Sequence, residues 1–249
     1  MNSKWLRQFA PAAGEGLRLV CFPHAGGSAS ALVPLARALG DRLDVYVVQY
    51  PGRQDRYREE PFRNIAAHAD ALAREIAPLA SEPYAFFGHS MGAVLAHETA
   101  RRLSDAGLPA PRRLFLSGRG APTGRPSVHD RLSGDAEVLA AVTMLGGTGP
   151  AVLDDPELRE MVLPALRADY AALGSYDSAP GTPLDTGITA LIGDSDPVVT
   201  VAEAAAWEEH TTGDFRLEVF PGGHFYLDEH TEALSSAVAE GFLATDPQA

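Results

Sequence analysis

Residues Tyr84 to Glu98 read YAFFGHSMGAVLAHE, and the rest of the chain is best interpreted from this stretch. The first four residues are apolar and predict a buried strand, whereas the residues from Val94 onward follow a helical pattern. Between them lies Gly88-His89-Ser90-Met91-Gly92, a Gly-x-Ser-x-Gly motif. Between a strand and a helix, this motif forms a sharp, strained turn that presents the serine hydroxyl at the head of the helix. We therefore predict that Ser90 is a nucleophile, the alternative being a tight turn with an idle serine.

Composition limits what the protein can be. The chain has 249 residues, of which 45% are hydrophobic, enough for one large domain with a single core. A formal net charge of −13 argues against binding to nucleic acid or to anionic membranes. The single cysteine, Cys21, allows no internal disulfide and fits a reducing compartment. Residues 1–10 lack the apolar core of a signal peptide, and no run is long enough to span a membrane, so we expect a cytoplasmic protein.

Apolar runs alternate with helical patterns as far as about residue 122. This alternation predicts an α/β fold, a mostly parallel sheet with helices on both faces. The predicted strands are residues 5–9, 17–22, 44–50, 84–87, 113–117, 188–193 and 215–220. The predicted helices include one that ends near Gly40, one from the N-cap Asn64 to Ala80, one that ends near His210 and one over about 231–243.

The alternation breaks between Thr123 and Thr186, where helical pieces near residues 134–145 and 156–173 occur without a convincing strand. Asp155-Pro156-Glu157 is typical of a helix start, and Pro164 should kink or divide the helix that follows. We interpret the segment as a lid over the carboxyl edge of the sheet. An ordinary pair of crossover helices is the alternative, but such connections are usually shorter. We expect one domain over residues 1–249 that includes this insertion.

A serine hydroxyl needs a base to take its proton, and the base needs a third group to orient it. When the nucleophile lies on a strand–turn–helix, its partners follow in the order acid and then histidine, on loops after later strands. Asp196 follows the strand that ends at Gly193, and His224 follows the last strand between a glycine and an apolar residue. We predict His224 as the base and favour Asp196 over Asp194 as the acid, because Asp196 lies further beyond the strand end.

An oxyanion hole requires two backbone N–H groups. We expect one from Met91, the residue after the nucleophile, and the other from Ala25 in the loop His24-Ala25-Gly26-Gly27 after the first main strand. A simple turn is the alternative for that loop. The sequence contains no metal-ligand cluster, Walker loop or dinucleotide fingerprint, so we expect neither a metal nor a cofactor.

Further short motifs extend the pattern along almost the whole chain. They are Cys21-Phe22-Pro23-His24-Ala25-Gly26-Gly27-Ser28, Tyr50-Pro51-Gly52-Arg53, Phe87-Gly88-His89-Ser90-Met91-Gly92, Ser117-Gly118-Arg119, Leu145-Gly146-Gly147-Thr148, Arg167-Ala168-Asp169-Tyr170, Gly193-Asp194-Ser195-Asp196-Pro197 and Pro221-Gly222-Gly223-His224-Phe225. Together they make the chain resemble the type II thioesterases, free-standing editing enzymes of polyketide and nonribosomal-peptide assembly lines, within the α/β-hydrolase superfamily. The family also includes the external thioesterases of fatty-acid synthesis.

The resemblance implies Ser90, Asp196 and His224 as a catalytic triad, the Ala25 and Met91 amides as the oxyanion hole, and a helical lid over about residues 125–180. It also implies the substrate, an acyl group in thioester linkage to the phosphopantetheine arm of an acyl or peptidyl carrier protein. On this interpretation the carrier is a transient partner, and the phosphopantetheine belongs to the substrate. The absence of a fused carrier domain favours action in trans, and a monomer is the default expectation for the oligomeric state.

Three alternatives remain open from the residues alone. The same triad could transfer the acyl group to an alcohol or amine, or it could hydrolyse ordinary esters, because the acceptor and the leaving group decide the outcome. A third possibility is a non-catalytic module that binds carrier proteins. The intact order of Ser90, Asp196 and His224 counts against that last alternative.

Overall fold

The computed structural model describes residues 3–9, 17–132, 134–147, 155–178 and 181–244. Its strands form one seven-stranded sheet in the order β1-β3-β2-β4-β5-β6-β7. All neighbouring strands are parallel except β1, which runs antiparallel to β3 at the edge. The strands are β1 (Leu6–Arg7), β2 (Arg18–Phe22), β3 (Asp44–Val48), β4 (Tyr84–His89), β5 (Arg113–Ser117), β6 (Gly187–Gly193) and β7 (Phe215–Phe220).

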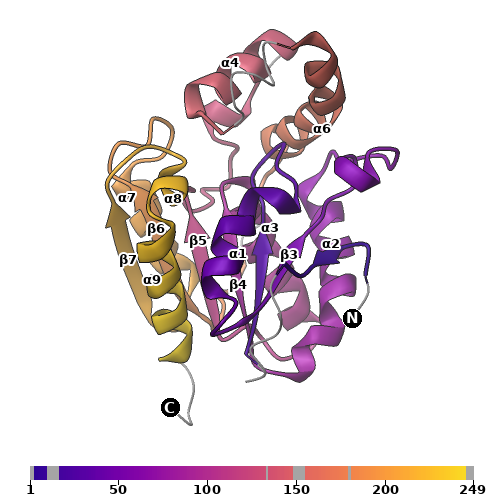
Figure 1. Cartoon of the computed structure of the whole chain (residues 1–249). Helices are drawn as coiled ribbons and strands as arrows, with labels where there is room; N and C mark the ends of the chain where they lie inside the picture. Colours follow the sequence, from indigo (N-terminus) through magenta and orange to yellow (C-terminus); the bar gives the residue numbers. More distant parts are fainter. Residues whose placement is uncertain (1–2, 10–16, 133, 148–154, 179–180, 245–249) are drawn as a thin grey trace.

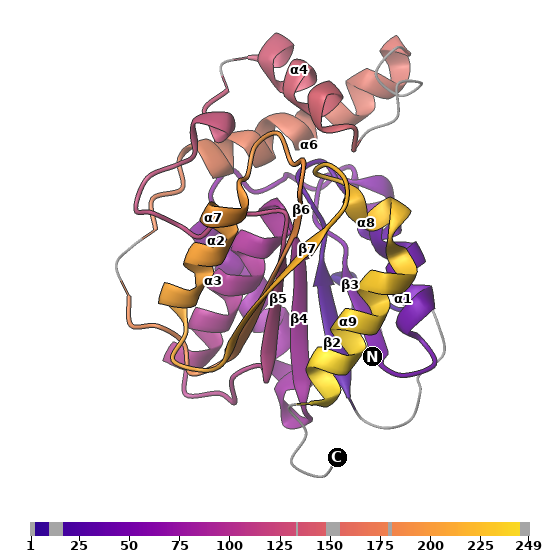
Figure 2. The ribbon, with the colours of Figure 1, turned by 90° about the vertical axis from the view of Figure 1, so that its left-hand side faces the viewer.

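Helices cover both faces of the sheet, as the alternating pattern predicts (Figures 1 and 2). Successive residues of a strand point to opposite faces, so Phe86 packs with α2 and α3 whereas Phe87 packs with α1 and α9. The central strands are therefore buried on both sides and read as continuous apolar runs. The helices are α1 (Val33–Leu39), α2 (Ile65–Ile76), α3 (Met91–Asp105), α7 (Val201–Ala205), α8 (Tyr226–Glu229) and α9 (Thr231–Leu243).

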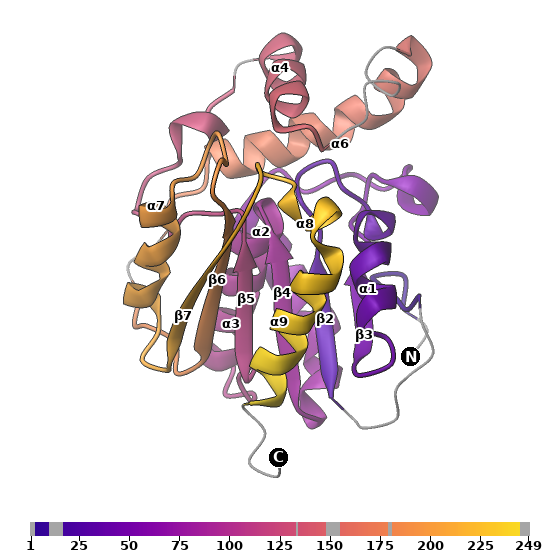
Figure 3. The same ribbon diagram turned by 60° about the vertical axis from the view of Figure 1, so that its left-hand side comes forward.

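The segment between β5 and β6 lies above the carboxyl edge of the sheet (Figures 1 and 3). It contains a 3-10 turn, η4 (Val128–Asp130), and two helices, α4 (Asp135–Leu145) and α6 (Pro156–Gly174). The described residues of this segment form no named strand. Its position agrees with the predicted lid over that edge.

Helix α6 begins as predicted, because the Asp155 side chain accepts hydrogen bonds from the Glu157 and Leu158 amides. Pro164 does not divide the helix, which continues from Pro156 to Gly174. Proline removes one backbone donor, and the packing of the following turns is sufficient to keep the helix continuous.

Most predicted boundaries agree with the structure, and β5, β7 and α9 begin and end at the predicted residues. The edge strand is shorter than expected, with only Leu6 and Arg7 paired, and β3 ends at Val48 rather than Tyr50. The predicted helix from Asn64 to Ala80 is α-helical only to Ile76 and continues as a 3-10 helix. Helix α8 was not predicted, because four residues are too few for a periodic pattern.

Candidate active site

Ser90 lies between β4 and α3 in a backbone conformation that is rare for a residue with a side chain. Its φ is 56° and its ψ is −116°. The Ser90 amide donates to the Ser117 carbonyl of neighbouring β5 at 2.8 Å, and the Ser90 carbonyl accepts from Ala93 at 3.0 Å. The turn is therefore held from both sides, so the strained conformation is retained by its surroundings.

The glycines on either side of Ser90 make this turn possible. A Cβ on Gly88 would lie 2.2 Å from the Gly92 carbonyl oxygen, and one on Gly92 would lie 1.9 Å from the Phe22 carbonyl oxygen. Both contacts are with backbone, which cannot move aside easily. Only glycine fits at these two positions, and β2, β4 and α3 can approach one another closely as a result.

His224 and Asp196 come together from the loops after β7 and β6. The His224 Nδ1 atom lies 2.7 Å from Asp196 Oδ2, and both side chains are almost fully buried. The second carboxylate oxygen, Oδ1, accepts from the Val198 amide at 2.9 Å and from the Val199 amide at 3.2 Å. These bonds fix the carboxylate, which binds the imidazole at Nδ1. Nε2 is therefore the nitrogen of His224 that can face a substrate.

Asp194, the competing acid, lies elsewhere. Its Oδ1 atom accepts from the Gly222 amide at 3.0 Å and from the Ser195 hydroxyl at 2.8 Å, and the side chain is exposed. These hydrogen bonds, with that of the Ser195 hydroxyl the larger effect, lower the pKa of the Asp194 carboxyl. Asp194 thus links the loop after β6 to the loop after β7, whereas Asp196 contacts the histidine.

The two expected oxyanion donors lie at the head of α3 and in the loop after β2. Met91 is the first residue of α3, so its N–H has no acceptor within the helix. In the loop, the Gly27 amide donates to the His24 carbonyl at 3.0 Å, which closes a turn around Ala25. Ala25 lines the same cavity as Ser90 and His224. Both residues therefore lie close to Ser90, one next to it in the chain and the other in the lining of the same cavity.

That cavity has a volume of about 850 Å³ and lies between the lid segment and the carboxyl edge of the sheet. Its lining is mainly apolar, with residues from α4 and α6 on one side and Ser90, Val94 and His224 on the other. Arg119 and Asp130 also line it, and they form a two-point ion pair with N–O distances of 3.0 and 2.5 Å. This ion pair ties η4 to the loop after β5, and sequence reasoning missed it.

Two further histidines, the buried His89 and the partly buried His24, lie near His224 but are poorly suited to be bases. Burial, with smaller effects from nearby His224, lowers the pKa of His24 to about 3 and that of His89 well below its usual value. The His89 Nδ1 atom shares a hydrogen bond of 2.9 Å with the Ser117 hydroxyl. Both rings also pack against Phe225. They contribute shape to the site, and among the residues that the structure describes neither ring is hydrogen-bonded to a carboxylate.

The described residues contain no group of three or more His, Cys, Asp or Glu side chains that could hold a metal ion. Over the same residues, none of the helices has both the length and the apolar character needed to cross a membrane. Cys21, as expected, is buried within β2.

The chain is similar to known proteins over most of its length. The family profile described as Thioesterase domain matches residues 17–241. A probable cadicidin biosynthesis thioesterase of Streptomyces griseus is 45% identical over 240 residues, which cover 96% of this chain and 66% of that protein. Thioesterase PikA5 of Streptomyces venezuelae is 40% identical, over 97% of this chain and 86% of that protein. The structure of the type II thioesterase BorB from the borrelidin biosynthetic cluster has a TM-score of 0.84 and 44% identity, covering 96% of this chain and 97% of that chain.

Proposed function

The chain belongs to the thioesterase family, with relatives in polyketide and nonribosomal-peptide pathways, and from this premise we propose that it hydrolyses acyl thioesters of carrier proteins. The observation that carries the proposal is the shared cavity of Ser90 and His224, with Asp196 bound to the far side of the imidazole. The family already identifies a hydrolase acting on thioesters. The proposal adds the residues and the carrier-bound substrate.

In the first half of the reaction, His224 Nε2 takes the proton of the Ser90 hydroxyl as the oxygen attacks the thioester carbonyl carbon. The Asp196 carboxylate keeps Nδ1 protonated and stabilises the imidazolium that forms. The carbonyl oxygen becomes an oxyanion, which the Met91 and Ala25 amides stabilise. The C–S bond then breaks, and the thiol leaves with the proton from His224. A thiol leaves readily because its pKa is about 8.5, well below that of an alcohol.

In the second half, a water molecule attacks the acyl–Ser90 ester. His224 takes one proton from the water and returns it to the Ser90 oxygen as the C–O bond breaks. The products are the free acid and the regenerated enzyme. Every protein group in these reaction steps is a side chain or a backbone amide, so the proposal includes no metal and no cofactor. The phosphopantetheine belongs to the substrate.

The carrier-bound substrate is supported by the relatives and by the cavity. One relative is named as a probable thioesterase of cadicidin biosynthesis, and a similar structure, YbtT, is named as a type II thioesterase of the yersiniabactin NRPS/PKS pathway. A cavity of about 850 Å³ with a mainly apolar lining can accept an acyl chain and the end of a pantetheine arm. We propose that the carrier protein binds transiently and that the enzyme acts as a monomer in the cytoplasm.

The test compares two acyl donors that share the acyl group and differ in the leaving group. The same acyl group is supplied as a carrier-protein thioester and as a simple oxygen ester, to the intact protein and to Ser90→Ala. We expect fast release of free thiol together with free acid from the carrier, and loss of both in Ser90→Ala. Rapid cleavage of the oxygen ester with the carrier untouched would show a general esterase. Appearance of a new ester or amide would show acyl transfer, and carrier binding without turnover would show a non-catalytic module.

A further inference from the structure

The loop after β2, which supplies Ala25, is held from outside by three side chains. The Tyr50 hydroxyl donates to the Pro23 carbonyl at 3.0 Å, at the start of the loop. Gln49 Oε1 accepts from the Ala29 amide at 2.8 Å, at its end. Between them, Asp169 Oδ2 accepts from the Gly26 amide at 2.7 Å. Gln49 and Tyr50 come directly after β3 in the chain, whereas Asp169 belongs to the lid helix α6.

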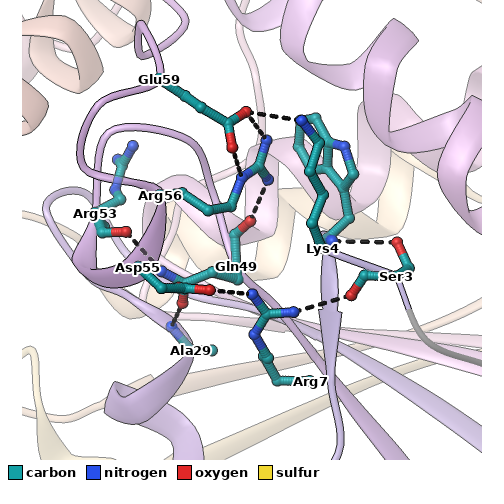
Figure 4. Close-up of polar contacts among 10 residues, drawn as sticks. Ser3, Lys4, Arg7, Ala29, Gln49, Arg53, Asp55, Arg56 and Glu59 are labelled. Atoms are coloured by element: carbon teal, nitrogen blue, oxygen red, sulfur yellow. Dashed lines mark hydrogen bonds and ion pairs between the residues drawn. The ribbon is translucent and has the colours of Figure 1, made fainter.

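Figure 4 shows how the β3 side of this arrangement is built. Gln49 lies between Ala29 and Arg53, and its Nε2 atom donates to the Arg53 carbonyl at 3.0 Å. The backbone carbonyl of Gln49 accepts from Arg56 Nη1 at 2.7 Å. The backbone of Arg53 is therefore fixed relative to the loop that contains Ala25.

The guanidinium of Arg53 extends from this position to Asp169. Arg53 Nη2 donates to Asp169 Oδ2, and Arg53 Nη1 donates to the Pro51 carbonyl at 2.7 Å. The Arg53 side chain is only 4% exposed and that of Asp169 only 1%. One carboxylate oxygen thus accepts from both the arginine and the Gly26 amide, and the two side chains of the ion pair are almost fully buried.

Helix α6 also contacts the loop sterically. Gly26 has a φ of +73°, and a Cβ at this residue would lie 2.4 Å from Leu166 Cδ2. Leu166 precedes Asp169 by three residues, so the two lie on the same side of α6. The part of α6 that follows Pro164 is therefore docked on the loop by both a hydrogen bond and close packing.

The two peptide groups that flank Ala25 are consequently both fixed. A trans peptide directs its carbonyl and its N–H in opposite directions. The His24 carbonyl accepts from Gly27, which directs the Ala25 N–H away from the turn. The next N–H, that of Gly26, points at Asp169. Without this second bond, the turn from His24 to Gly27 would lose its attachment to α6, and the Ala25 N–H that the turn carries could shift from its position.

We propose that Asp169, held by Arg53, is a positioning residue that fixes the Ala25 amide as an oxyanion donor. This inference rests on the proposed function, because it assigns Ala25 a place in the reaction. On this proposal the end of α6 that carries Asp169 is part of the catalytic scaffold.

Two variants separate positioning from simple stabilisation. Asp169→Ala leaves a buried, unpaired arginine, so it should lower both the melting temperature and kcat. The double variant Arg53→Met with Asp169→Leu removes both charges and refills the space, so it should recover most of the melting temperature. It still lacks an acceptor for Gly26. We expect its kcat to remain about 10- to 100-fold below that of the intact protein, because a small misplacement of a catalytic group costs that much.

Three further readouts make the test specific. The KM of the double variant should change far less than its kcat, because the oxyanion exists only in the transition state. Its pH–rate profile should keep its shape, because His224 and Asp196 are untouched. Asp214→Asn, which breaks the pair between buried Arg113 and Asp214 at the opposite edge of the sheet, is the matched control and should retain full kcat.

Recovery of kcat together with the melting temperature in the double variant would show that the ion pair only stabilises the fold, and would overturn the inference. Ser90→Ala is measured in the same assay. If it retained wild-type activity, the proposed function and this inference would both fail, whereas a dead Ser90→Ala beside a fully active double variant would reject only the role of Asp169.

Discussion

The Asp196 carboxylate lies 2.7 Å from His224 Nδ1, and both side chains are withdrawn from solvent although each comes from a loop. Two amides of the same loop, those of Val198 and Val199, donate to the other carboxylate oxygen and hold it in place. The His224 ring is thus oriented by a carboxylate whose own position is fixed by hydrogen bonds. This relationship makes the role of Asp196 directly testable.

Replacing Asp196 with Asn should lower kcat by about 10⁴-fold, because an amide in this position favours the wrong imidazole tautomer. The fold should persist, since Asn occupies the same space and its oxygen can still accept from the Val198 amide. Asp194→Asn is the matched control, two residues away and exposed. We expect steady-state kinetics to show nearly wild-type kcat for that control. Equal losses in the two variants would contradict the assignment.

The second prediction concerns Gly92. Alanine at this position would place its Cβ 1.9 Å from the Phe22 carbonyl oxygen, so α3 and β2 would have to separate. We expect Gly92→Ala to lower the free energy of unfolding by about 3 kcal/mol or more, as forced displacements in a packed core do. Gly223→Ala, whose Cβ would meet nothing closer than 4.0 Å, serves as control in urea denaturation. A Gly92→Ala protein as stable as this control would refute the close approach.

Acid should destabilise the protein through its buried histidines. Burial, with smaller opposing and reinforcing effects from Glu98, His210 and Arg101, lowers the pKa of His97 to about 3. Between pH 3 and the ordinary histidine pKa of about 6.5, the unfolded chain therefore binds more protons at this residue than the folded chain does. Stability is complete above that ordinary pKa and is lost as the pH falls through this window.

For His97 alone, the loss between pH 7.5 and pH 5.0 should be about 2 kcal/mol. Urea denaturation should show that the free energy of unfolding of His97→Gln changes less between the two pH values than that of the intact protein. This holds whatever the absolute stability of the variant. His129→Gln, at an exposed position, should keep the wild-type difference. An unchanged pH dependence in His97→Gln would mean that the ring is not kept neutral by burial.

The cavity should limit the length of the acyl group. Ala141 of α4 lines it, whereas Thr143 of the same helix is exposed and does not. Ala141→Phe should lower kcat/KM for an octanoyl thioester by about tenfold or more and leave acetyl thioester hydrolysis nearly unchanged, since one methylene in such a pocket is worth about 10- to 200-fold. Thr143→Phe adds the same ring outside the cavity. A uniform loss for both acyl lengths would argue that the chain lies elsewhere.

The sheet could be predicted from sequence because its strands are short apolar runs bounded by glycine, proline or charged residues. Phe215–Phe220 and Arg113–Ser117 are examples in which both ends agree. The meeting of His224 with Asp196 could also be anticipated, since both follow parallel strands that end at one edge. The choice of Asp196 over Asp194 required more than spacing, namely which carboxylate the loop turns inward.

The contacts of Asp169 could not be read from spacing, because the residue lies 143 positions from Gly26 and 116 from Arg53. A signal was nevertheless present. Asp169 lies on a helical face with Leu166 and Leu173, where a charged residue must be paired if that face is buried. The motifs that contain Arg53 and Asp169 carry the family resemblance, but their role became visible only when the folded chain placed them together.

The central claim is that Ser90 carries the acyl group during thioester hydrolysis. Rapid-quench mass spectrometry of the intact protein, mixed with an acyl-loaded carrier protein, tests it most directly. We predict a transient mass increase equal to the acyl group, located on the peptide that contains Ser90, absent in Ser90→Ala and matched in time by the release of carrier thiol. Release of thiol and acid by the Ser90→Ala variant, or an acyl group found on another residue, would contradict the account.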